Sequence, residues 1–188
     1  FFIFLGDYLD RGLENVQTLE YLLDLYENHD NIYFLEGNHE SHLRNWAHGE
    51  DIMSPEFRNH TMPKLEQAGI DKKRVRQFCR SFGQCSHFIF HGMNVLVTHG
   101  GLSIMPKNLT FIATEQMIKG VGDYKDANAV DNAFYTHTED GYYSVHGHRN
   151  ETNEPLQVNP ATFNLNGEVE FGGNLRAVTF RHENWLDK

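Results

Sequence analysis

Gly6-Asp7-Tyr8-Leu9-Asp10-Arg11-Gly12 follows directly on the apolar run from Phe1 to Leu5. A short apolar run that stops at a glycine-flanked polar turn predicts a buried strand ending in a loop. A second stretch has the same form, because Gly37-Asn38-His39-Glu40 follows the run from Ile32 to Leu35. Ligand sites of open α/β sheets lie at the carboxyl ends of their strands. The two turns are therefore expected to carry carboxylate, amide and imidazole groups to the carboxyl end of a sheet.

The chain between the two turns predicts a helix. From Leu13 to Tyr26 the apolar residues recur at intervals of three and four, and Asn28 to Asn31 form a polar turn. A strand, a helix and a second strand in this order imply two neighbouring parallel strands joined by a right-handed crossover.

Two histidine-containing turns downstream have similar settings. The run from Asn94 to Thr98 is predicted as a strand that delivers His99, and 143–145 as a strand that delivers His146 and His148. Short helices are expected over 40–76, followed by a helical element over 74–82. The remaining predictions are a strand over 88–90 paired with 94–98, a helix over 113–118, a loop-rich segment over 120–140, and antiparallel strands over 161–165, 168–171 and 175–180.

Length and composition bound the class of protein. A chain of 188 residues with 39% hydrophobic residues fits one soluble globular domain spanning 1–188. The sequence has no apolar run near the roughly 20 residues that span a bilayer, so no membrane partner is expected. A formal net charge of −10 argues against an extended nucleic-acid surface, although not against a strand end bound in a metal-centred pocket. The two cysteines are expected to be reduced thiols in a cytoplasmic protein.

The motifs together resemble a known family. The stretches GDYLDRG, GNHE, His99-Gly100-Gly101-Leu102 and Gly147-His148-Arg149 stand in the order found in calcineurin-like metallophosphoesterases. The branch most similar holds Ser/Thr protein phosphatases, diadenosine tetraphosphatases and bacterial polynucleotide phosphatases. The resemblance runs from Phe1 to about Phe180. It implies an α/β fold (α+β by some schemes), a sandwich of two mixed β-sheets flanked by helices.

One motif of that family is not found. The family opens with a strand that ends in Asp-x-His, tens of residues before the GDxxDRG turn, whereas this sequence starts inside the strand leading to that turn. We therefore expect a chain truncated at its amino end, and the alternative is a natural degenerate member of the family. Whether a signal peptide lies upstream stays open.

The resemblance implies two divalent metal ions, with manganese expected and iron or zinc as alternatives. Asp7 would bridge both ions, and Asn38, His99 and His148 would complete one site, while the other site would need the missing motif. The donor set of carboxylate, amide oxygen and imidazole suits such ions. Two ions about 3.5–4 Å apart can neutralise phosphoryl oxygens and make a water nucleophilic. His146 is an alternative ligand to His148, and Glu40 is expected to support the site without binding metal.

The resemblance also assigns the proton chemistry. The attack on phosphorus would come from a metal-bound hydroxide, without a covalent enzyme intermediate. His39 would protonate the leaving oxygen, and Asp10 would hold its ring and favour the charged imidazolium. Arg11 would clamp the phosphate, because a guanidinium can bind two phosphate oxygens at once. Arg149 is a second candidate for this clamp.

The substrate class stays open among a phosphoprotein, a dinucleoside polyphosphate and a nucleic-acid end. The segment 40–76 is predicted as a cap that selects among them, and the oligomeric state is not predicted. Two other interpretations also stay open. The chain could be a non-catalytic binding scaffold of the same fold, or an inactive fragment of an enzyme, although a scaffold has no need of His39, Asp10 and Arg11 together.

Overall fold

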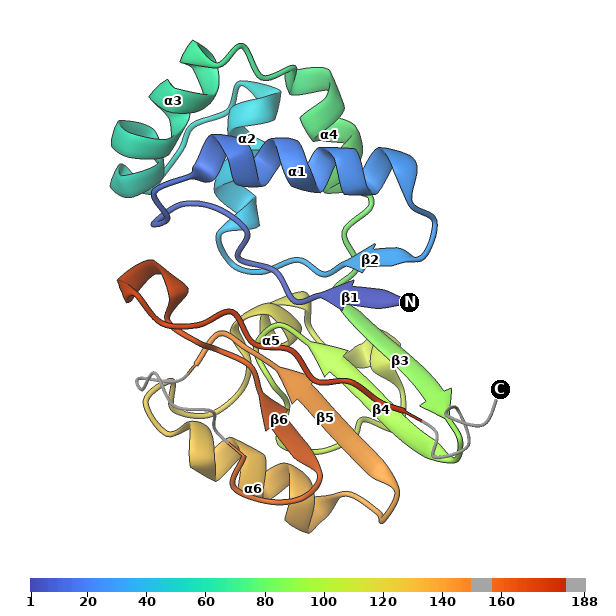
Figure 1. Ribbon diagram of the computed structural model, residues 1–188. Coiled ribbons are helices and arrows are strands. Elements are labelled where there is room, and N and C mark those ends of the chain that lie inside the picture. The colour runs from blue at the N-terminus through green and yellow to red at the C-terminus, as the bar shows by residue number, and fades with distance from the viewer. Residues whose placement is uncertain (150–156, 182–188) are drawn as a thin grey trace. The chain divides into compact units, whose positions relative to one another are not determined.

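The computed structural model, which describes residues 1–149 and 157–181, contains both helices and strands (Figure 1). The chain divides into two units, Phe1–Gln84 and Cys85–Lys188, and each unit contains its own sheet. The sheet of the first unit is parallel and that of the second is mixed. The expected α/β class is therefore confirmed. Within the described residues no helix is long and apolar enough to cross a membrane.

The first unit begins with the predicted strand–helix–strand order. Strand β1 (Phe2–Phe4) and strand β2 (Ile32–Phe34) pair in parallel, with Phe2 opposite Ile32, and helix α1 (Asn15–Asn28) joins them. The rest of the unit is helical, as expected for the segment that follows GNHE. Its elements are α2 (Glu40–His48), a π-helix (Phe57–Thr61), α3 (Met62–Gln67) and α4 (Lys72–Arg80).

The core of the first unit centres on Phe78 of α4. Its ring meets those of Tyr8, Phe34 and Phe82 at centroid distances of 6.3, 4.9 and 4.7 Å. Phe78 and the apolar face of α1 are fully buried, so this cluster holds the first turn, the second strand and the helices in one body. The two turns predicted to hold the site therefore start from a well-packed core.

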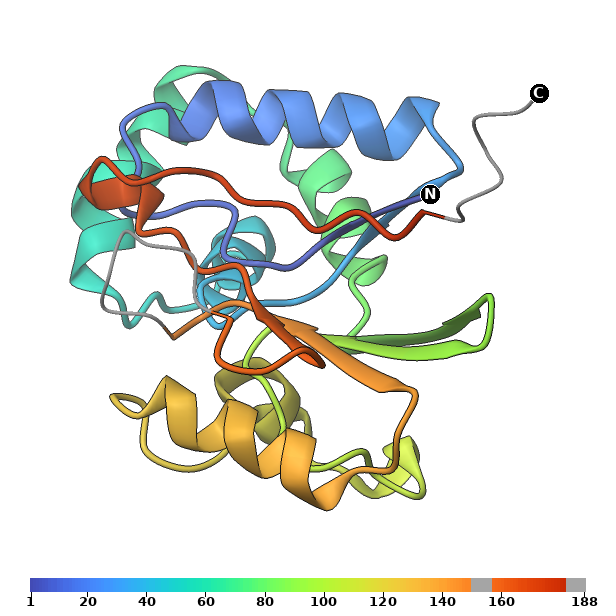
Figure 2. The ribbon, with the colours of Figure 1, turned by 60° about the horizontal axis from the view of Figure 1, so that its bottom comes forward.

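The second unit is a four-stranded sheet in the order β3-β4-β5-β6. Strands β3 (Cys85–Phe90) and β4 (Met93–Thr98) are antiparallel as predicted, while β5 (Tyr142–His146) is parallel to both β4 and β6 (Thr162–Asn164). Helices α5 (Thr114–Lys119) and α6 (Ala127–His137) cover one face, and the chain after β6 runs along the other (Figure 2). Leu96, Leu102 and Phe134 form the core beneath the helices.

The expectation of a loop-rich segment over 120–140 is wrong, because this segment contains α6. Asp126 caps the helix by accepting the backbone N–H of Ala129 at 2.9 Å. Val130 and Phe134 are buried at helical spacing, but Asp131 lies on the same face and is also buried. A carboxylate in a core position interrupts the apolar periodicity by which a helix is recognised in a sequence, so the sequence did not predict α6.

The strand predicted over 161–165 is confirmed as β6, but the expected antiparallel pairing and the strands over 168–171 and 175–180 are wrong. Strand β6 is parallel to β5, residues Val169–Phe171 form a 3₁₀-helix (a second such helix is Leu109–Phe111), and 175–180 are not paired as a strand. Glu168 and Gly172 both have positive φ, which turns the chain out of the extended conformation. Phe180 nevertheless packs edge-on against Phe163 at 6.0 Å, so side-chain packing takes the place of strand pairing.

Asp131 holds a fully buried histidine at the end of β5. Its Oδ1 lies 2.7 Å from Nε2 of His146, and both side chains are 1% exposed. The other ring nitrogen of His146 lies 3.1 Å from the carbonyl oxygen of Gly147. Both nitrogens are thereby engaged inside the second unit, which fixes the chain just before His148.

Replacing Asp131 should therefore destabilise the second unit. D131A leaves a buried ring nitrogen without its acceptor, and we expect a loss of about 2–4 kcal/mol in the free energy of unfolding. Urea unfolding followed by circular dichroism measures it. The matched control is D140A, which removes an exposed carboxylate and should stay within about 0.5 kcal/mol. Equal effects of the two variants would contradict the role given to Asp131.

Candidate functional site

The two turns of the first unit touch through their glycines. A Cβ at Gly6 would overlap the backbone of Gly37, and a Cβ at Gly37 would overlap the Asp7 carboxylate. Gly6 also has φ +98°, which side chains rarely adopt. The sequence therefore needs glycine at both positions, so that the turn with Asp7 and the turn with Asn38 can pack backbone against backbone.

Glu40 joins the two turns by a network of hydrogen bonds. Its Oε2 accepts the backbone N–H groups of Asp7 and Gly37, both at 2.7 Å, and its Oε1 accepts that of Tyr8 at 2.9 Å. The residue is 1% exposed, and it also begins α2, where a carboxylate is favoured by the helix dipole. Because both oxygens are taken by donors, Glu40 supports the site and is not placed to bind a metal.

Asp7 and Asn38 present oxygens that suit a divalent cation. Asp7 has φ +56°, and its Oδ1 accepts the backbone N–H of His39 at 3.0 Å, which fixes the direction of the carboxylate. Oδ1 of Asn38 is buried and has no hydrogen-bond donor among the residues that the structure describes. A buried amide oxygen without a donor is costly, and a cation would satisfy it. This half of the predicted ligand set therefore fits a metal.

Asp10 and His39 form a hydrogen-bonded pair. Oδ2 of Asp10 lies 2.8 Å from Nδ1 of His39, and the two side chains are 2% and 15% exposed. The hydrogen bond to Asp10 raises the pKa of His39, and this effect outweighs the opposing effect of partial burial. Asp10 adopts φ +122°, which is strained for any residue except glycine. Such strain at a buried carboxylate is typical of functional sites.

His42 is a neighbour that the sequence analysis did not include. Its ligand atom and those of Asp10 and His39 lie within 4.8 Å of one another, which is close enough for a cation. Its ring packs edge-on to His39 at 6.0 Å, and burial lowers the pKa of His42. His42 follows His39 by three residues at the start of α2, and residues at this spacing are neighbours on a helix. The sequence could therefore have indicated that the two rings lie close together.

His99 and His148 lie together in the second unit. They follow β4 and β5, two adjacent parallel strands, and the N–H of Gly147 donates to the carbonyl of His99 at 2.9 Å. Their ring centroids are 5.0 Å apart, so the two predicted imidazole ligands lie next to each other. His148 has φ +67°, and its carbonyl accepts the hydroxyl of Tyr124 at 3.0 Å. His146, the alternative ligand, is instead turned to Asp131.

Arg149 corrects a sequence prediction. The residue is 1% exposed, and its guanidinium donates to the carbonyls of Lys119 at 2.8 Å, Val121 at 2.7 Å and Asp123 at 3.3 Å. It therefore holds the 119–123 loop and is not placed as a phosphate clamp. Arg11, the other predicted clamp, is exposed in its loop next to Asp10. The two arginines differ because the Arg149 guanidinium is buried against loop carbonyls, whereas the Arg11 side chain is exposed.

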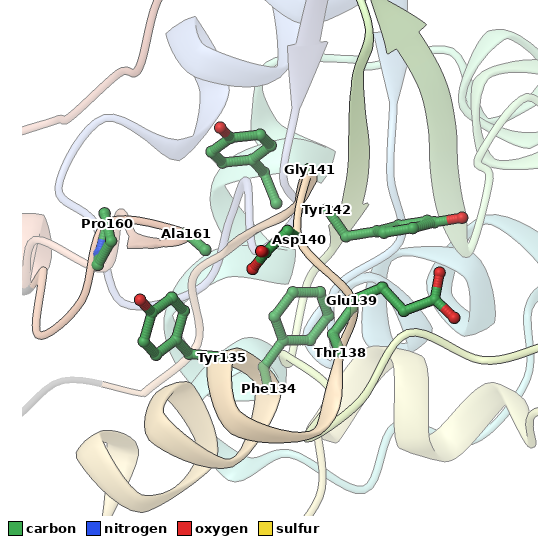
Figure 3. Close-up of a pocket in the computed structure, with 10 residues that line it drawn as sticks. Phe134, Tyr135, Thr138, Glu139, Asp140, Gly141, Tyr142, Pro160 and Ala161 are labelled. Carbon is green, nitrogen blue, oxygen red and sulfur yellow. The ribbon is translucent and has the colours of Figure 1, made fainter.

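A cavity of the second unit lies away from this chemistry. Its volume is about 260 Å³, and Figure 3 shows Phe134, Tyr135, Asp140 and Pro160 among its lining. It lies beside Tyr142, at the start of β5, whereas His148 follows the end of that strand. None of the predicted metal ligands lines this cavity.

Comparison with known proteins identifies the family of this chain. The family model described as calcineurin-like phosphoesterase matches residues 1–174. The serine/threonine-protein phosphatase sitA of Aspergillus fumigatus is 33% identical over 103 residues, which cover 54% of this chain and 24% of that protein. The chain thus matches about a quarter of the length of this relative.

A solved structure agrees at the level of the fold. A candidate diadenosine tetraphosphatase superposes with a TM-score of 0.59 at 14% identity, covering 91% of this chain and 72% of that one. At this identity the likeness shows the fold alone.

The network around Glu40 predicts a large loss of stability in E40A. The change leaves the N–H groups of Asp7, Tyr8 and Gly37 without their buried acceptor, which should cost about 2–4 kcal/mol of unfolding free energy. Thermal and urea unfolding measure this cost, with the exposed Glu50 changed to Ala as the control. An E40A chain as stable as E50A would show that the turns do not depend on this carboxylate.

Substitution of Arg149 should lower the stability of the fold, whereas substitution of Arg11 should not. R149M removes the donors that hold three loop carbonyls, and we expect a loss of about 2–4 kcal/mol in unfolding free energy. R11M changes an exposed side chain and should stay within about 0.5 kcal/mol of the parent. If R149M leaves stability unchanged and weakens binding of inorganic phosphate, the phosphate-clamp interpretation is right after all.

Proposed function

We propose that this chain, which belongs to the calcineurin-like phosphoesterase family, hydrolyses a phosphate ester with the help of divalent cations. Membership of the family supports phosphoester hydrolysis in general. The observation that carries the proposal is the Asp10–His39 pair, a buried carboxylate in a strained backbone conformation beside a half-buried imidazole. The same unit holds the Asp7 carboxylate, which accepts the backbone N–H of His39, and the buried Oδ1 of Asn38.

Four residues are proposed as metal ligands: Asp7 and Asn38 from the first unit, and His99 and His148 from the second. Their assignment to one centre rests on the order of the family's motifs together with the geometry inside each unit. When bound, divalent cations would neutralise the phosphoryl oxygens and lower the pKa of a coordinated water. Manganese is proposed as the metal, with iron and zinc as alternatives, and Asp7 as the residue shared by two ions.

The chain's own residues would bind the ester and supply the proton. Arg11, whose side chain is exposed, would bind the phosphoryl oxygens. His39 would give a proton to the leaving oxygen from Nε2, because Nδ1 is held by Asp10. The raised pKa of His39 favours the protonated ring that this role needs. General acid catalysis of this kind typically contributes ~10²–10⁴-fold.

The substrate is proposed as a phosphoprotein, a dinucleoside polyphosphate or a phosphorylated nucleic-acid end. The named relatives, a serine/threonine-protein phosphatase and a candidate diadenosine tetraphosphatase, support this range. The segment 40–76, which holds α2, the π-helix and α3, is proposed to choose among them. Cys79 and Cys85 are free thiols, which fits the proposed cytoplasmic location.

Two substitutions test the catalytic assignment. In the longest form of the chain that its gene encodes, D7N should lower turnover at least about 100-fold, because the shared metal ligand loses its charge. H39A should lower turnover by ~10²–10⁴-fold. Hydrolysis is measured with added manganese on a phosphopeptide, a dinucleoside tetraphosphate and a 3′-phosphorylated oligonucleotide.

The controls are D51N and H29A, which change exposed residues of the same unit and should keep parental rates. Circular dichroism confirms that each variant is folded. If the parent is silent on all three substrates with manganese, iron, zinc and nickel, a non-catalytic scaffold becomes the better interpretation. Unchanged turnover in D7N or H39A would overturn the role of that residue alone.

A further inference from the structure

Asp10 is held by its backbone as well as by its carboxylate. Its N–H donates to Oδ1 of Asn15 at 3.1 Å, and its carbonyl accepts Nδ2 of the same amide at 3.1 Å. The hydroxyl of Thr61 donates to that carbonyl at 2.9 Å. All three residues are 3% exposed or less, so these bonds form without competition from water.

Thr61 completes a closed network. It donates to the Asp10 carbonyl and accepts Nδ2 of Asn15 at 3.2 Å, so Asp10, Asn15 and Thr61 each bond to the other two. The φ of Asp10, +122°, costs free energy for a residue with a Cβ and persists only where its surroundings fix it. The network supplies that constraint, and the carboxylate then faces Nδ1 of His39.

The position of Thr61 depends on an uncommon helix. Phe57–Thr61 is a π-helix, and the N–H of Met62 donates to the carbonyl of Phe57, five residues back. Single π-helical turns inside helices frequently occur at functional sites. The segment 54–61, which ends in this π-helix, begins with Ser54, whose hydroxyl accepts the N–H of Phe57 at 3.1 Å and lies 3.4 Å from Oδ2 of Asp10. The segment therefore reaches both the backbone and the carboxylate of Asp10.

We propose that Thr61 is a positioning residue for the proton donor: with Asn15, it holds Asp10 in the conformation that aligns its carboxylate with His39. This inference rests on the proposed function, because it assumes that His39 protonates the leaving oxygen. Thr61 lies within 40–76, the segment proposed to select the substrate. The segment that meets the substrate thus also sets the geometry of the acid, and a substrate that displaces Ser54–Thr61 would misalign the pair.

The test is the change Thr61→Val, which keeps the shape of the side chain and removes the hydroxyl. We expect turnover of an alkyl phosphate to fall between about 10- and 100-fold, part of what general acid catalysis contributes. Turnover of p-nitrophenyl phosphate should change less than about 3-fold, because its leaving group departs without a proton. T61S, which keeps the hydroxyl, should restore the alkyl phosphate rate.

A second readout does not depend on activity. The proton on Nδ1 of His39, hydrogen-bonded to Asp10, should give a downfield proton resonance that is identified by its loss in H39A. In T61V this signal should shift or broaden while the circular dichroism spectrum stays parental. Thr136→Val on α6, which removes an exposed hydroxyl, is the matched control and should change neither the signal nor the rates.

The outcomes distinguish the general acid role of His39 from the positioning role of Thr61. If H39A lowers both substrates equally, the general acid role itself fails. If H39A shows the leaving-group dependence and T61V does not, only the positioning role fails. An equal loss on both substrates in T61V, with a lower melting temperature, would show a purely structural role. Should T61V not fold, Asn15→Ser removes the other arm of the network and should give the same substrate pattern.

Discussion

The geometry of the candidate site depends on the Glu40 carboxylate, which accepts the backbone N–H groups of Asp7, Tyr8 and Gly37. Parallel strands β1 and β2 bring the two turns side by side, but pairing ends at Phe4 and Phe34. Beyond that point the N–H groups of both turns need a buried acceptor, and one carboxylate with two oxygens serves three of them. The direction of the Asp7 carboxylate, and with it the site, follows from this arrangement.

Strain is concentrated where the backbone network can hold it. Asp7 and Asp10 both have positive φ, and each costs on the order of 1–3 kcal/mol relative to relaxed backbone. Around Asp7 the offset comes from Glu40, and around Asp10 from Asn15 and Thr61. These partners come from α2, α1 and the π-helix, so the two aspartates are fixed by tertiary contacts and not by local preference. Reactive carboxylates held in this way do not need to reorganise when a substrate binds.

The local motifs predicted much of the fold and of the candidate site. Glycine turns after apolar runs identified β1, β2 and the strands before His99 and His148, because each signal is contained in a few adjacent residues. The failures share a cause. Asp131 in the core of α6 and Arg149 beneath the 119–123 loop bond to partners far away in the chain, and the positive φ of Glu168 has no signal in the apolar pattern. A polar residue looks exposed in sequence unless its distant partner is known, so α6 and the role of Arg149 were missed.

The first unit can be organised for catalysis before any cation arrives. Oδ1 of Asn38 and Oδ1 of Asp10 are buried acceptors without a donor among the described residues, and the Asp10 carboxylate is fixed through its other oxygen by His39 and Ser54. An unsatisfied buried acceptor costs about 1–3 kcal/mol, so each of these two oxygens lowers the free energy of unfolding. A cation near Asn38 would satisfy its buried oxygen and remove part of this cost. In the proposed function, the fold would fix the Asp10–His39 pair, and a bound cation would add charge to a geometry that already exists.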